Sequence, residues 1–281
     1  MAATISVVIP TYNSEAVIGK CLASIEEQSY PPLNVVVCDG GSTDDTVAIA
    51  ISLGATLLTS VANRSAQRNA GAKHALGQYI VFVDSDMRLT RNVLENCVAT
   101  FSESDAALVI PEVDVGTSYW AKVRRFERGF YREAWWLKAA RCYRKEQFLQ
   151  IDGFEVGLIG AEDWDLDERI REFGKVREVS ATIEHDEGNI AFGRLIQKKG
   201  HYAASFSEFE RRNPERAKKC FSEMQRLLLI IRRPGRIVSH PVLAVGLVCL
   251  GISEVFVSRG WLMPSLKDHV ERPLDSSEPS A

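Results

Sequence analysis

The stretch of sequence that decides the fold is Tyr79-Ile80-Val81-Phe82-Val83-Asp84-Ser85-Asp86. Five apolar residues bounded by Gly77 and by the two aspartates are typical of an interior strand of a parallel sheet. In open α/β sheets, ligands bind just beyond the carboxyl ends of such strands. Two carboxylates placed there can share Mg²⁺ or Mn²⁺, and that cation can hold a diphosphate. The alternative interpretation is a solvated turn whose acids cap a helix.

The residues before this stretch predict further strands of the same sheet at 4–9, 34–38 and 55–59, with helices beginning near residues 14, 46 and 63. Polar residues follow the strands, namely Pro10-Thr11-Tyr12-Asn13-Ser14-Glu15 after the first and Asp39-Gly40-Gly41-Ser42-Thr43 after the second. The glycines allow a ligand to approach the backbone closely. Three strand ends therefore bring polar residues to one edge, which predicts a nucleotide site with a metal. Neither the Gly-x-Gly-x-x-Gly motif of dinucleotide-binding domains nor a P-loop follows the first strand.

Four segments carry a family resemblance: Ile9-Pro10-Thr11-Tyr12-Asn13, Val37-Cys38-Asp39-Gly40-Gly41-Ser42-Thr43-Asp44, Gln67-Arg68-Asn69-Ala70-Gly71 and Val83-Asp84-Ser85-Asp86. In order and spacing they resemble the inverting family 2 glycosyltransferases, over roughly residues 4–190. The resemblance implies a GT-A fold, a nucleoside-diphosphate sugar and a divalent cation, Mn²⁺ or Mg²⁺. It favours uridine diphosphate first and guanosine diphosphate second.

The resemblance also implies roles for individual residues. Pro10, Thr11 and Tyr12 line the base pocket, Asp39 reads the base edge and Arg68 approaches the nucleotide. Asp84 lies at the ribose or the metal, and Asp86 binds the metal. The remaining donor-binding candidates are Glu15, two residues after the first segment, and Gly41, Asn69 and Ser85 within the others.

If the protein is a transferase, the second half of the chain must supply the residues that catalyse the transfer. A helix is expected to begin near Glu162 or Asp163, where acids are favoured by the helix dipole alone. Inverting transfer needs a carboxylate that takes a proton from the acceptor hydroxyl. Glu162-Asp163 resembles the family's Glu-Asp pair, which implies Asp163 as the base and Glu162 as an orienting acid. His185 follows a short strand and, as in several relatives, could complete the metal shell, although a lone histidine is more often structural.

The C-terminal part differs in character from the rest. From Arg194 to Arg236 there are twelve Lys or Arg residues against four Glu, although the whole chain carries a net charge of −3. The apolar run 237–257 follows and approaches the length of a membrane span, but Pro241 and Glu254 interrupt it. A re-entrant or interfacial helix on anionic lipid is therefore expected, and the alternative is an apolar helix packed on the catalytic domain or on a neighbouring subunit.

Other features set limits on the class of protein. The periodicity of 117–141 predicts one amphipathic helix, and its interleaved cations match no motif that reads nucleic acid. Six dispersed cysteines and the absence of an N-terminal signal sequence predict a reducing, cytoplasmic setting. A Gln-x-x-Arg-Trp motif, carried by processive members of the family, is absent.

The sequence thus predicts an α/β protein, a GT-A-like, mostly parallel sheet flanked by helices with a helical C-terminal extension. The expected catalytic domain covers 1–190, with a nucleotide-binding half (1–100) and an acceptor half (101–190). A basic extension (191–263) and a disordered tail (264–281) follow.

The expected activity is metal-dependent, inverting transfer of one sugar to a hydroxyl acceptor. The expected acceptor is a polyprenyl-linked glycan at the cytoplasmic face of the membrane, in cell-envelope or glycan biosynthesis. Two alternatives stay open: a catalytically silent nucleotide-sugar-binding scaffold, and a soluble enzyme that glycosylates a small metabolite or a protein.

Overall fold

A computed structural model describes residues 3–186, 188–203 and 206–258. Its large sheet has seven strands in the order β3-β2-β1-β4-β8-β6-β9. Their bounds are β1 Ile5–Thr11, β2 Asn34–Asp39, β3 Thr56–Thr59, β4 Tyr79–Phe82, β6 Asp105–Val109, β8 Cys142–Arg144 and β9 Lys175–Glu178. A small sheet of three strands has the order β5-β10-β7, with bounds β5 Met87–Leu89, β10 Ile183–Asp186 and β7 Glu112–Val115. The predicted tail 264–281 lies outside the described residues.

The first four strands confirm the expected parallel half of the sheet. β1 pairs in parallel with β2 and with β4, and all seven of its residues are buried. The strand was expected to stop at Pro10 but runs on to Thr11. A proline is tolerated there because β4 pairs only with Ile5 to Val8, so the ladder on that side has already ended.

The other neighbour of β4 is an antiparallel strand of the mostly parallel sheet that was expected. β4 pairs antiparallel with β8, and β8 pairs antiparallel with β6. The predicted interior strand is buried on both faces, as expected, and its two neighbours are one parallel and one antiparallel strand. Val83 lies just beyond β4, and its N–H donates to the carbonyl of Val8 at 3.0 Å.

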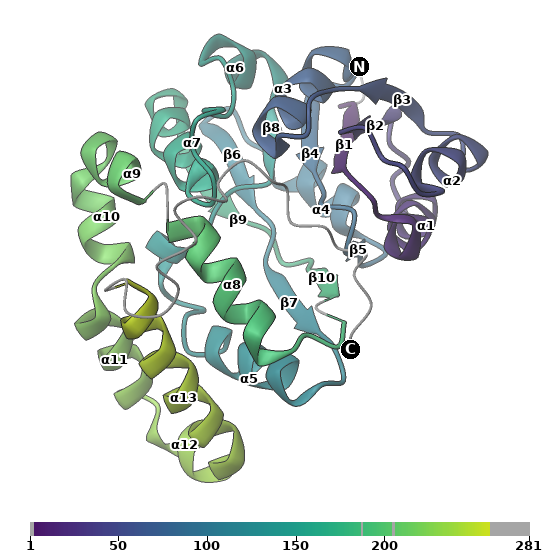
Figure 1. Cartoon of the computed structure of the whole chain (residues 1–281). Helices are drawn as coiled ribbons and strands as arrows, with labels where there is room; N and C mark the ends of the chain where they lie inside the picture. The colour runs from purple at the N-terminus through teal and green to yellow at the C-terminus, as the bar shows by residue number, and fades with distance from the viewer. Residues whose placement is uncertain (1–2, 187, 204–205, 259–281) are drawn as a thin grey trace.

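Helices cover both faces of the large sheet (Figure 1). One face packs against α1 (Glu15–Glu26), α2 (Thr46–Ser52) and α4 (Val93–Thr100), and the other against α3 (Arg64–His74), α6 (Lys145–Gln150) and α7 (Glu162–Ile170). Alternation along the strands explains the division, since Val7 and Ile9 of β1 face the first layer and Val8 faces the second. The resulting three-layer arrangement positions the loops that follow the parallel strands β1, β2 and β4 at one edge, whereas the antiparallel β8 leads into α6 at the opposite edge.

The segment 117–141 is not the single helix that was predicted. Helix α5 covers Tyr119–Arg128, and a short 3₁₀-helix η1 follows at Trp135–Leu137. The Arg236 guanidinium packs over the rings of Phe126 and Phe130, at 5.5 and 5.1 Å from their centroids. A Cβ on Gly129 would collide with that guanidinium. Helix α5 therefore ends at the point where Arg236 of the C-terminal extension packs on this segment.

The expected helical extension is present, as α8 Phe192–Ala203, α9 Phe206–Arg212, α10 Pro214–Cys220, α11 Glu223–Ile231, α12 Pro234–Ser239 and α13 Pro241–Ser258. A second 3₁₀-helix, η2 (Arg171–Phe173), directly follows α7. The run 237–257 is divided between α12 and α13, because Pro241 begins a new helix. Helix α13 crosses α5 closely at Gly246, where a Cβ would lie 2.5 Å from the Tyr119 hydroxyl. In the part of the chain that was described, none of the helices combines the length and apolarity that a bilayer crossing requires.

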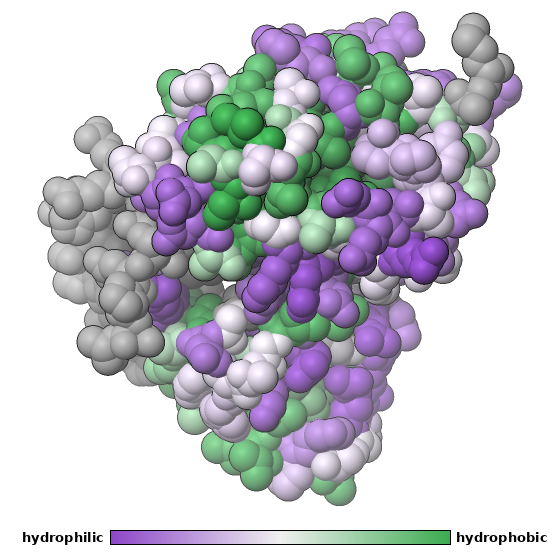
Figure 2. All heavy atoms as spheres, turned by 90° about the vertical axis from the view of Figure 1, so that its right-hand side faces the viewer, coloured by the Kyte–Doolittle hydropathy of each residue, from purple (hydrophilic) through white to green (hydrophobic). Residues whose placement is uncertain are grey.

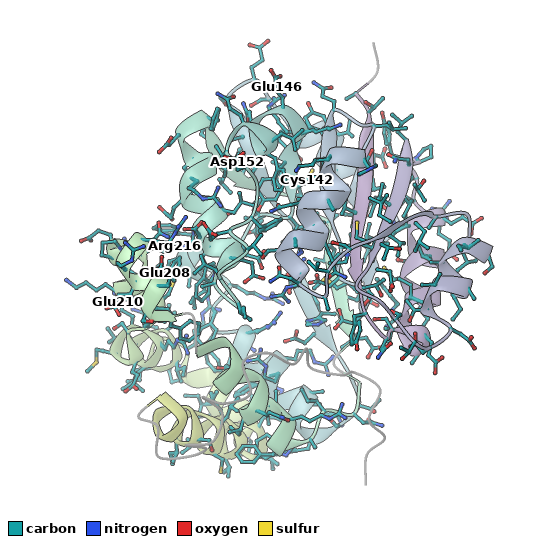
Figure 3. The ribbon with its side chains drawn as sticks, turned by 45° about the horizontal axis from the view of Figure 1, so that its top comes forward. Cys142, Glu146, Asp152, Glu208, Glu210 and Arg216 are labelled. Carbon is teal, nitrogen blue, oxygen red and sulfur yellow. The ribbon has the colours of Figure 1, made fainter. Side chains whose placement is uncertain are left out.

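Helix α10 is tied to the part of the protein that contains the large sheet by the buried Arg216 (Figure 3). Its guanidinium donates to the carbonyl of Lys138 at 2.7 Å and to the carboxylate of Glu168 at 2.9 Å. It also lies 3.4 Å from the buried carboxylate of Asp167. The extension is therefore joined to the helix that carries the candidate catalytic acids.

Substitution of Gly71 should show how tightly α3 packs on the sheet. A Cβ on Gly71 would lie 2.3 Å from Val8 Cγ1 and 2.8 Å from Cys38 Sγ. We expect Gly71→Ala to lower the free energy of unfolding by about 1–3 kcal/mol, measured by urea denaturation. The matched control is Gly193→Ala in α8, where nothing lies within 4 Å of the added Cβ and the better helix propensity of alanine should be neutral or stabilising. Equal effects of the two substitutions would contradict this packing.

Candidate active site

The loops that follow β1 and β2 are joined by hydrogen bonds. Asn13 has a positive φ of 44°, and its Oδ1 accepts from the N–H of Thr43 at 2.9 Å. The Asn13 N–H donates to Ser42 Oγ at 2.9 Å. Glu15 Oε2 accepts from the N–H of Asp45 at 3.0 Å. Asn13, Ser42 and Thr43 were not among the candidate site residues. They could have been identified, because they lie within the segments that carry the family resemblance.

Asp39 lies at the end of β2, and its carboxylate holds its own loop. Its Oδ2 accepts from the N–H groups of Gly41 and Ser42, both at 2.8 Å, and its Oδ1 accepts from the Ser42 hydroxyl. Gly41 has a φ of 92°, a region that favours glycine. Thr11 is buried and its carbonyl accepts from the Gln67 amide at 2.8 Å. Both predicted base-pocket segments therefore line one edge of the sheet.

Arg68 of α3 is the centre of the site. It is 1% exposed and donates to Asp84 Oδ1 at 2.6 Å and to Asp163 Oδ1 at 3.0 Å. The same guanidinium lies 3.6 Å from Glu162 Oε1. Its other side packs over the ring of Phe154 at 5.1 Å. The structure thus brings the predicted acids from both halves of the chain around one buried cation.

Glu162 and Asp163 begin α7, as predicted. Glu162 is buried, ion-paired with Arg64, and accepts from the N–H of Gly160 at 2.7 Å. The Asp163 side chain is 32% exposed, so it remains accessible to a ligand. Burial raises the pKa of Asp163 above its ordinary value, and although Arg68 lowers it, the Glu162 charge adds to the rise. A carboxyl with a raised pKa is better matched to proton transfer.

Two predicted donor-binding residues contact protein groups. The Asn69 amide donates to the carbonyl of Phe154 and accepts from its N–H, each at 2.8 Å. Asn69 therefore fixes the loop whose aromatic ring packs on Arg68. Ser85 donates to Ser14 Oγ at 3.0 Å, which links the aspartate pair to the start of α1. Their contact with a donor stays a prediction.

Charged residues that the sequence analysis did not name extend the network. Arg141 lies 3.4 Å from Asp84 Oδ2 and donates to Glu112 Oε1 at 2.6 Å. Arg128 of α5 lies 3.1 Å from Glu112 and 3.0 Å from Asp114. Although burial opposes it, the Arg68 and Arg141 charges hold the pKa of Asp84 well below its ordinary value. Glu112 and Asp114 lie two residues apart on β7, and this spacing in the sequence indicates that their side chains share one face of the strand.

Asp86 and His185 face each other across the small sheet. His185 lies within β10, opposite Met87 of β5, and its Nε2 is 3.2 Å from Asp86 Oδ2. Asp86 Oδ1 is buried and has no hydrogen-bond partner among the residues that the structure describes. Carboxylate oxygen and imidazole nitrogen suit Mn²⁺ well, so these residues fit a divalent cation.

Both Asp84 oxygens face guanidinium groups, which sets Asp84 apart from Asp86. Among the described residues, His, Cys, Asp and Glu side chains form no ready-made group of three for a metal.

Figure 2 shows hydrophilic side chains gathered across the middle of the face on the right of Figure 1.

Comparison with protein families matches residues 6–159 to "Glycosyl transferase family 2". Poly(ribitol-phosphate) beta-N-acetylglucosaminyltransferase TarS of Staphylococcus aureus is 36% identical over 115 residues, covering 37% of this chain and 20% of TarS. WfgD of Escherichia coli, a UDP-Glc:alpha-D-GlcNAc-diphosphoundecaprenol beta-1,3-glucosyltransferase, is 27% identical over 116 residues, covering 40% and 46% of the two chains. The matched regions thus span less than half of these relatives.

Solved structures share the fold. Mannosyltransferase PcManGT from Pyrobaculum calidifontis, in complex with GDP-Man and Mn²⁺, has a TM-score of 0.62 at 16% identity and covers 94% of this chain and 88% of its own. Residues 1–349 of S. aureus TarS with UDP-GlcNAc have a TM-score of 0.55 at 18% identity, with coverage of 93% and 92%. At these identities the likeness establishes the GT-A arrangement of the sheet and helices.

The ion pairs of Glu112 should make stability depend on pH. Burial opposes its charge, but Arg141, Arg128 and His185 lower its pKa from 4.5 to about 2. Because the folded-state pKa is depressed, these pairs stabilise fully above about pH 4.5, and the contribution is lost as the pH falls toward 2. We expect Glu112→Gln to lower the free energy of unfolding at pH 6 by up to about 3 kcal/mol, and the gap to shrink below pH 4.5.

Urea unfolding of both proteins across pH 2.5–7 measures that gap. Glu208→Gln is the control, because Glu208 is also paired with an arginine but lies at the surface, where solvent screens the pair. It should leave the unfolding curves unchanged. A Glu112→Gln gap that stays constant with pH would contradict the assignment.

Proposed function

Since the chain belongs to glycosyl transferase family 2, we propose that it transfers one sugar, with inversion, from a nucleoside-diphosphate sugar to a hydroxyl acceptor with the help of a divalent cation. The observation that carries this proposal is the position of Arg68. It joins Asp84, at the end of β4, to Asp163 and Glu162, at the start of α7. The candidate groups for the donor and for the acceptor are thereby held within one ion-paired cluster.

The donor would bind at the edge formed by the loops after β1 and β2. Thr11 and Asp39 end paired strands, and Gln67 ties their backbones together by donating to the carbonyls of Thr11 and Cys38. The loops are thus rigid before a ligand arrives, which reduces the entropy cost of binding. Uridine diphosphate is the first candidate for the nucleotide and guanosine diphosphate the second, in line with the ligands of TarS and PcManGT.

Asp86, His185 and Asp84 would hold the divalent cation, Mn²⁺ or Mg²⁺. When bound, such an ion neutralises negative charge on the departing diphosphate. Asp86 supplies an oxygen without a protein partner, and Asp84 is kept ionised by Arg68 and Arg141. Arg68 and Arg141 can also neutralise part of the negative charge of the diphosphate once a donor is bound.

Asp163 would act as the base. The acceptor oxygen forms a bond to the anomeric carbon as the bond from that carbon to the phosphate oxygen breaks, and the acceptor proton passes to Asp163. The nucleoside diphosphate leaves with the bonding electrons. Glu162, buried and fixed by Arg64 and Gly160, would hold Arg68 and Asp163 in place. The electrostatic surroundings thus support proton transfer on the face opposite the leaving group.

The acceptor is proposed to be a lipid-linked glycan at the membrane surface, as in the activity for which WfgD is named. Helices α11 to α13 lie together at one end of the molecule (Figure 1). Two rows of exposed apolar side chains, here the outer stripes, are Met224, Leu227, Leu228 and Ile231 on α11 and Val242, Val245, Val248 and Ile252 on α13. Each row has helical spacing, so it occupies one face of its helix.

Cationic side chains accompany the outer stripes. Arg232 is exposed directly after α11, and the half-buried Arg233 next to it is paired with Glu133, whereas Arg236 packs on Phe126 and Phe130. The opposite sides of the same helices pack on the protein, since Leu247 is buried with Phe126 and Phe130, and Ile230 and Ile237 are partly buried against them. An apolar face with basic flanks fits the surface of an anionic bilayer. A cytoplasmic location at the membrane face is part of this proposal.

The base assignment predicts a separation of binding from turnover. Asp163→Asn should keep the thermal stabilisation produced by UDP-sugar and Mn²⁺ but lower the transfer rate by about 10²–10⁴-fold, because the amide cannot take the proton. The control is Glu172→Gln, an exposed acid just beyond α7. A scaffold without activity would show donor binding and no turnover in the wild type. Near-normal turnover by Asp163→Asn would refute Asp163 as the base.

The pH dependence of the wild-type enzyme offers a second readout. Because the pKa of Asp163 is raised, kcat/KM should decline on the acid side at a higher pH than for an ordinary aspartate of pKa ~3.9. The rate should be high above that pKa, where Asp163 is ionised, and low below it.

Membrane docking can be tested with vesicles that contain phosphatidylglycerol. We expect the double variant Leu228→Glu, Val245→Glu to reduce the co-sedimenting fraction several-fold, because charged side chains resist burial in the bilayer interface. The control is Val61→Glu, Leu76→Glu, which changes two comparably exposed apolar residues of the catalytic body. Loss of binding in both double variants, or a wild type that ignores the vesicles, would count against docking through the outer stripes.

A further inference from the structure

The register of the small sheet places three ionisable side chains in a row. β10 pairs in parallel with β7, and His185 lies directly opposite Asp114. On its other side β10 pairs with β5, and the Asp186 N–H donates to the carbonyl of Asp86 at 3.0 Å. The order across the sheet is therefore Asp86, His185 and Asp114. The first two are candidate cation ligands, whereas Asp114 has no role in the proposed reaction.

Asp114 is a buried carboxylate held between Arg128 and His185. Its side chain is 0% exposed, and its Oδ1 lies 3.0 Å from Arg128 Nη1 and 3.6 Å from His185 Nδ1. Removing a carboxylate from water is unfavourable unless an opposite charge pairs with it, and Arg128 supplies that pairing here. Arg128 comes from α5 and also contacts Glu112, and these two contacts fix its guanidinium beside Asp114. Asp114 is thus fixed on the side of the imidazole that faces away from Asp86.

The geometry points to Asp114 as a positioning residue for His185. His185 Nε2 lies 3.2 Å from Asp86 Oδ2, and Nδ1 faces Asp114 Oδ1 at 3.6 Å. With a cation bound between Nε2 and Asp86, Nε2 would supply its lone pair and Nδ1 would carry the proton, on the side of Asp114. An imidazole that binds a metal through one nitrogen commonly donates its other N–H to a carboxylate, which sets the tautomer and increases the basicity of the ligand. We propose that Asp114 prepares His185 in this way to bind the divalent cation together with Asp86. This inference rests on the proposed function and assigns a role beyond the cation ligands themselves.

The direct test is titration with MnCl₂ in the presence of UDP, followed by the electron paramagnetic resonance signal of free Mn²⁺. We expect Asp114→Asn to weaken Mn²⁺ binding about 10–100-fold. The Mn²⁺ concentration for half-maximal transfer should rise in parallel, while the rate at saturating Mn²⁺ changes much less. Asn is close in size to Asp, and thermal melting confirms that the variant is folded.

Asp105→Asn is the matched control. Asp105 is equally buried and paired with one arginine, Arg177, but it lies on β6 among residues of the large sheet. This control should lower stability and leave the affinity for Mn²⁺ unchanged. His185→Ala is the reference for complete loss of the ligand. If Asp114→Asn binds Mn²⁺ like the wild type while His185→Ala does not, the role of Asp114 is wrong. If the wild type itself binds no Mn²⁺, the proposed cation dependence fails instead.

A measurement on the wild type does not depend on any variant. ¹⁵N nuclear magnetic resonance of the His185 ring with Mg²⁺ and UDP distinguishes the two neutral tautomers. We expect the proton on Nδ1, directed at Asp114. A proton on Nε2 would overturn the proposal, because that nitrogen could then not bind the cation.

Discussion

The burial of the Arg68 guanidinium is the constraint on which the site depends. A cation removed from water is costly unless opposite charges surround it, and here Asp84, Asp163 and Glu162 do so. Two of these acids come from α7, about eighty residues beyond β4 in the chain. The requirement to neutralise one guanidinium therefore holds the second half of the protein against the first.

The same requirement is repeated across the site. Arg141 neutralises Asp84 and Glu112, and Arg128 neutralises Glu112 and Asp114. The alternation of charge keeps carboxylates ionised at positions where burial alone would favour their protonation. Asp163 differs from the others because burial and the neighbouring Glu162 outweigh the attraction of Arg68. One network thus keeps Asp84 ionised beside the donor edge and makes Asp163 more basic.

The C-terminal extension is coupled to this network through packing. Helix α5 carries Arg128 on one side and contacts α13 on another, where the Tyr119 hydroxyl donates to the carbonyl of Val242 at 2.8 Å. Arg216 of α10 joins the extension to α7, the helix of Glu162 and Asp163. A surface that docks on a membrane through α11 and α13 would therefore be held in a fixed relation to Asp163, because α13 crosses α5 closely at Gly246 and the buried Arg216 joins α10 to α7.

Much of the fold could be predicted from the sequence, because local patterns carry the information. The apolar runs that became β1, β2 and β4, the helix start at Glu162, and the polar strand ends all follow from periodicity and from residue preferences. The antiparallel β8, the break after Arg128 and the small sheet could not be predicted in this way. They depend on which distant segments pack together, such as Arg236 on Phe126 and Phe130.

The sequence by itself determined the family resemblance, the strand ends and the identity of the acids at 84, 86, 162 and 163. Only the tertiary structure decided how these acids are paired, that Arg141, Arg128 and Asp114 join them, and that Asp86 faces His185. The reason is physical: pairing energies depend on distance and burial across strands and helices, and neither quantity is encoded in the local pattern of any single segment.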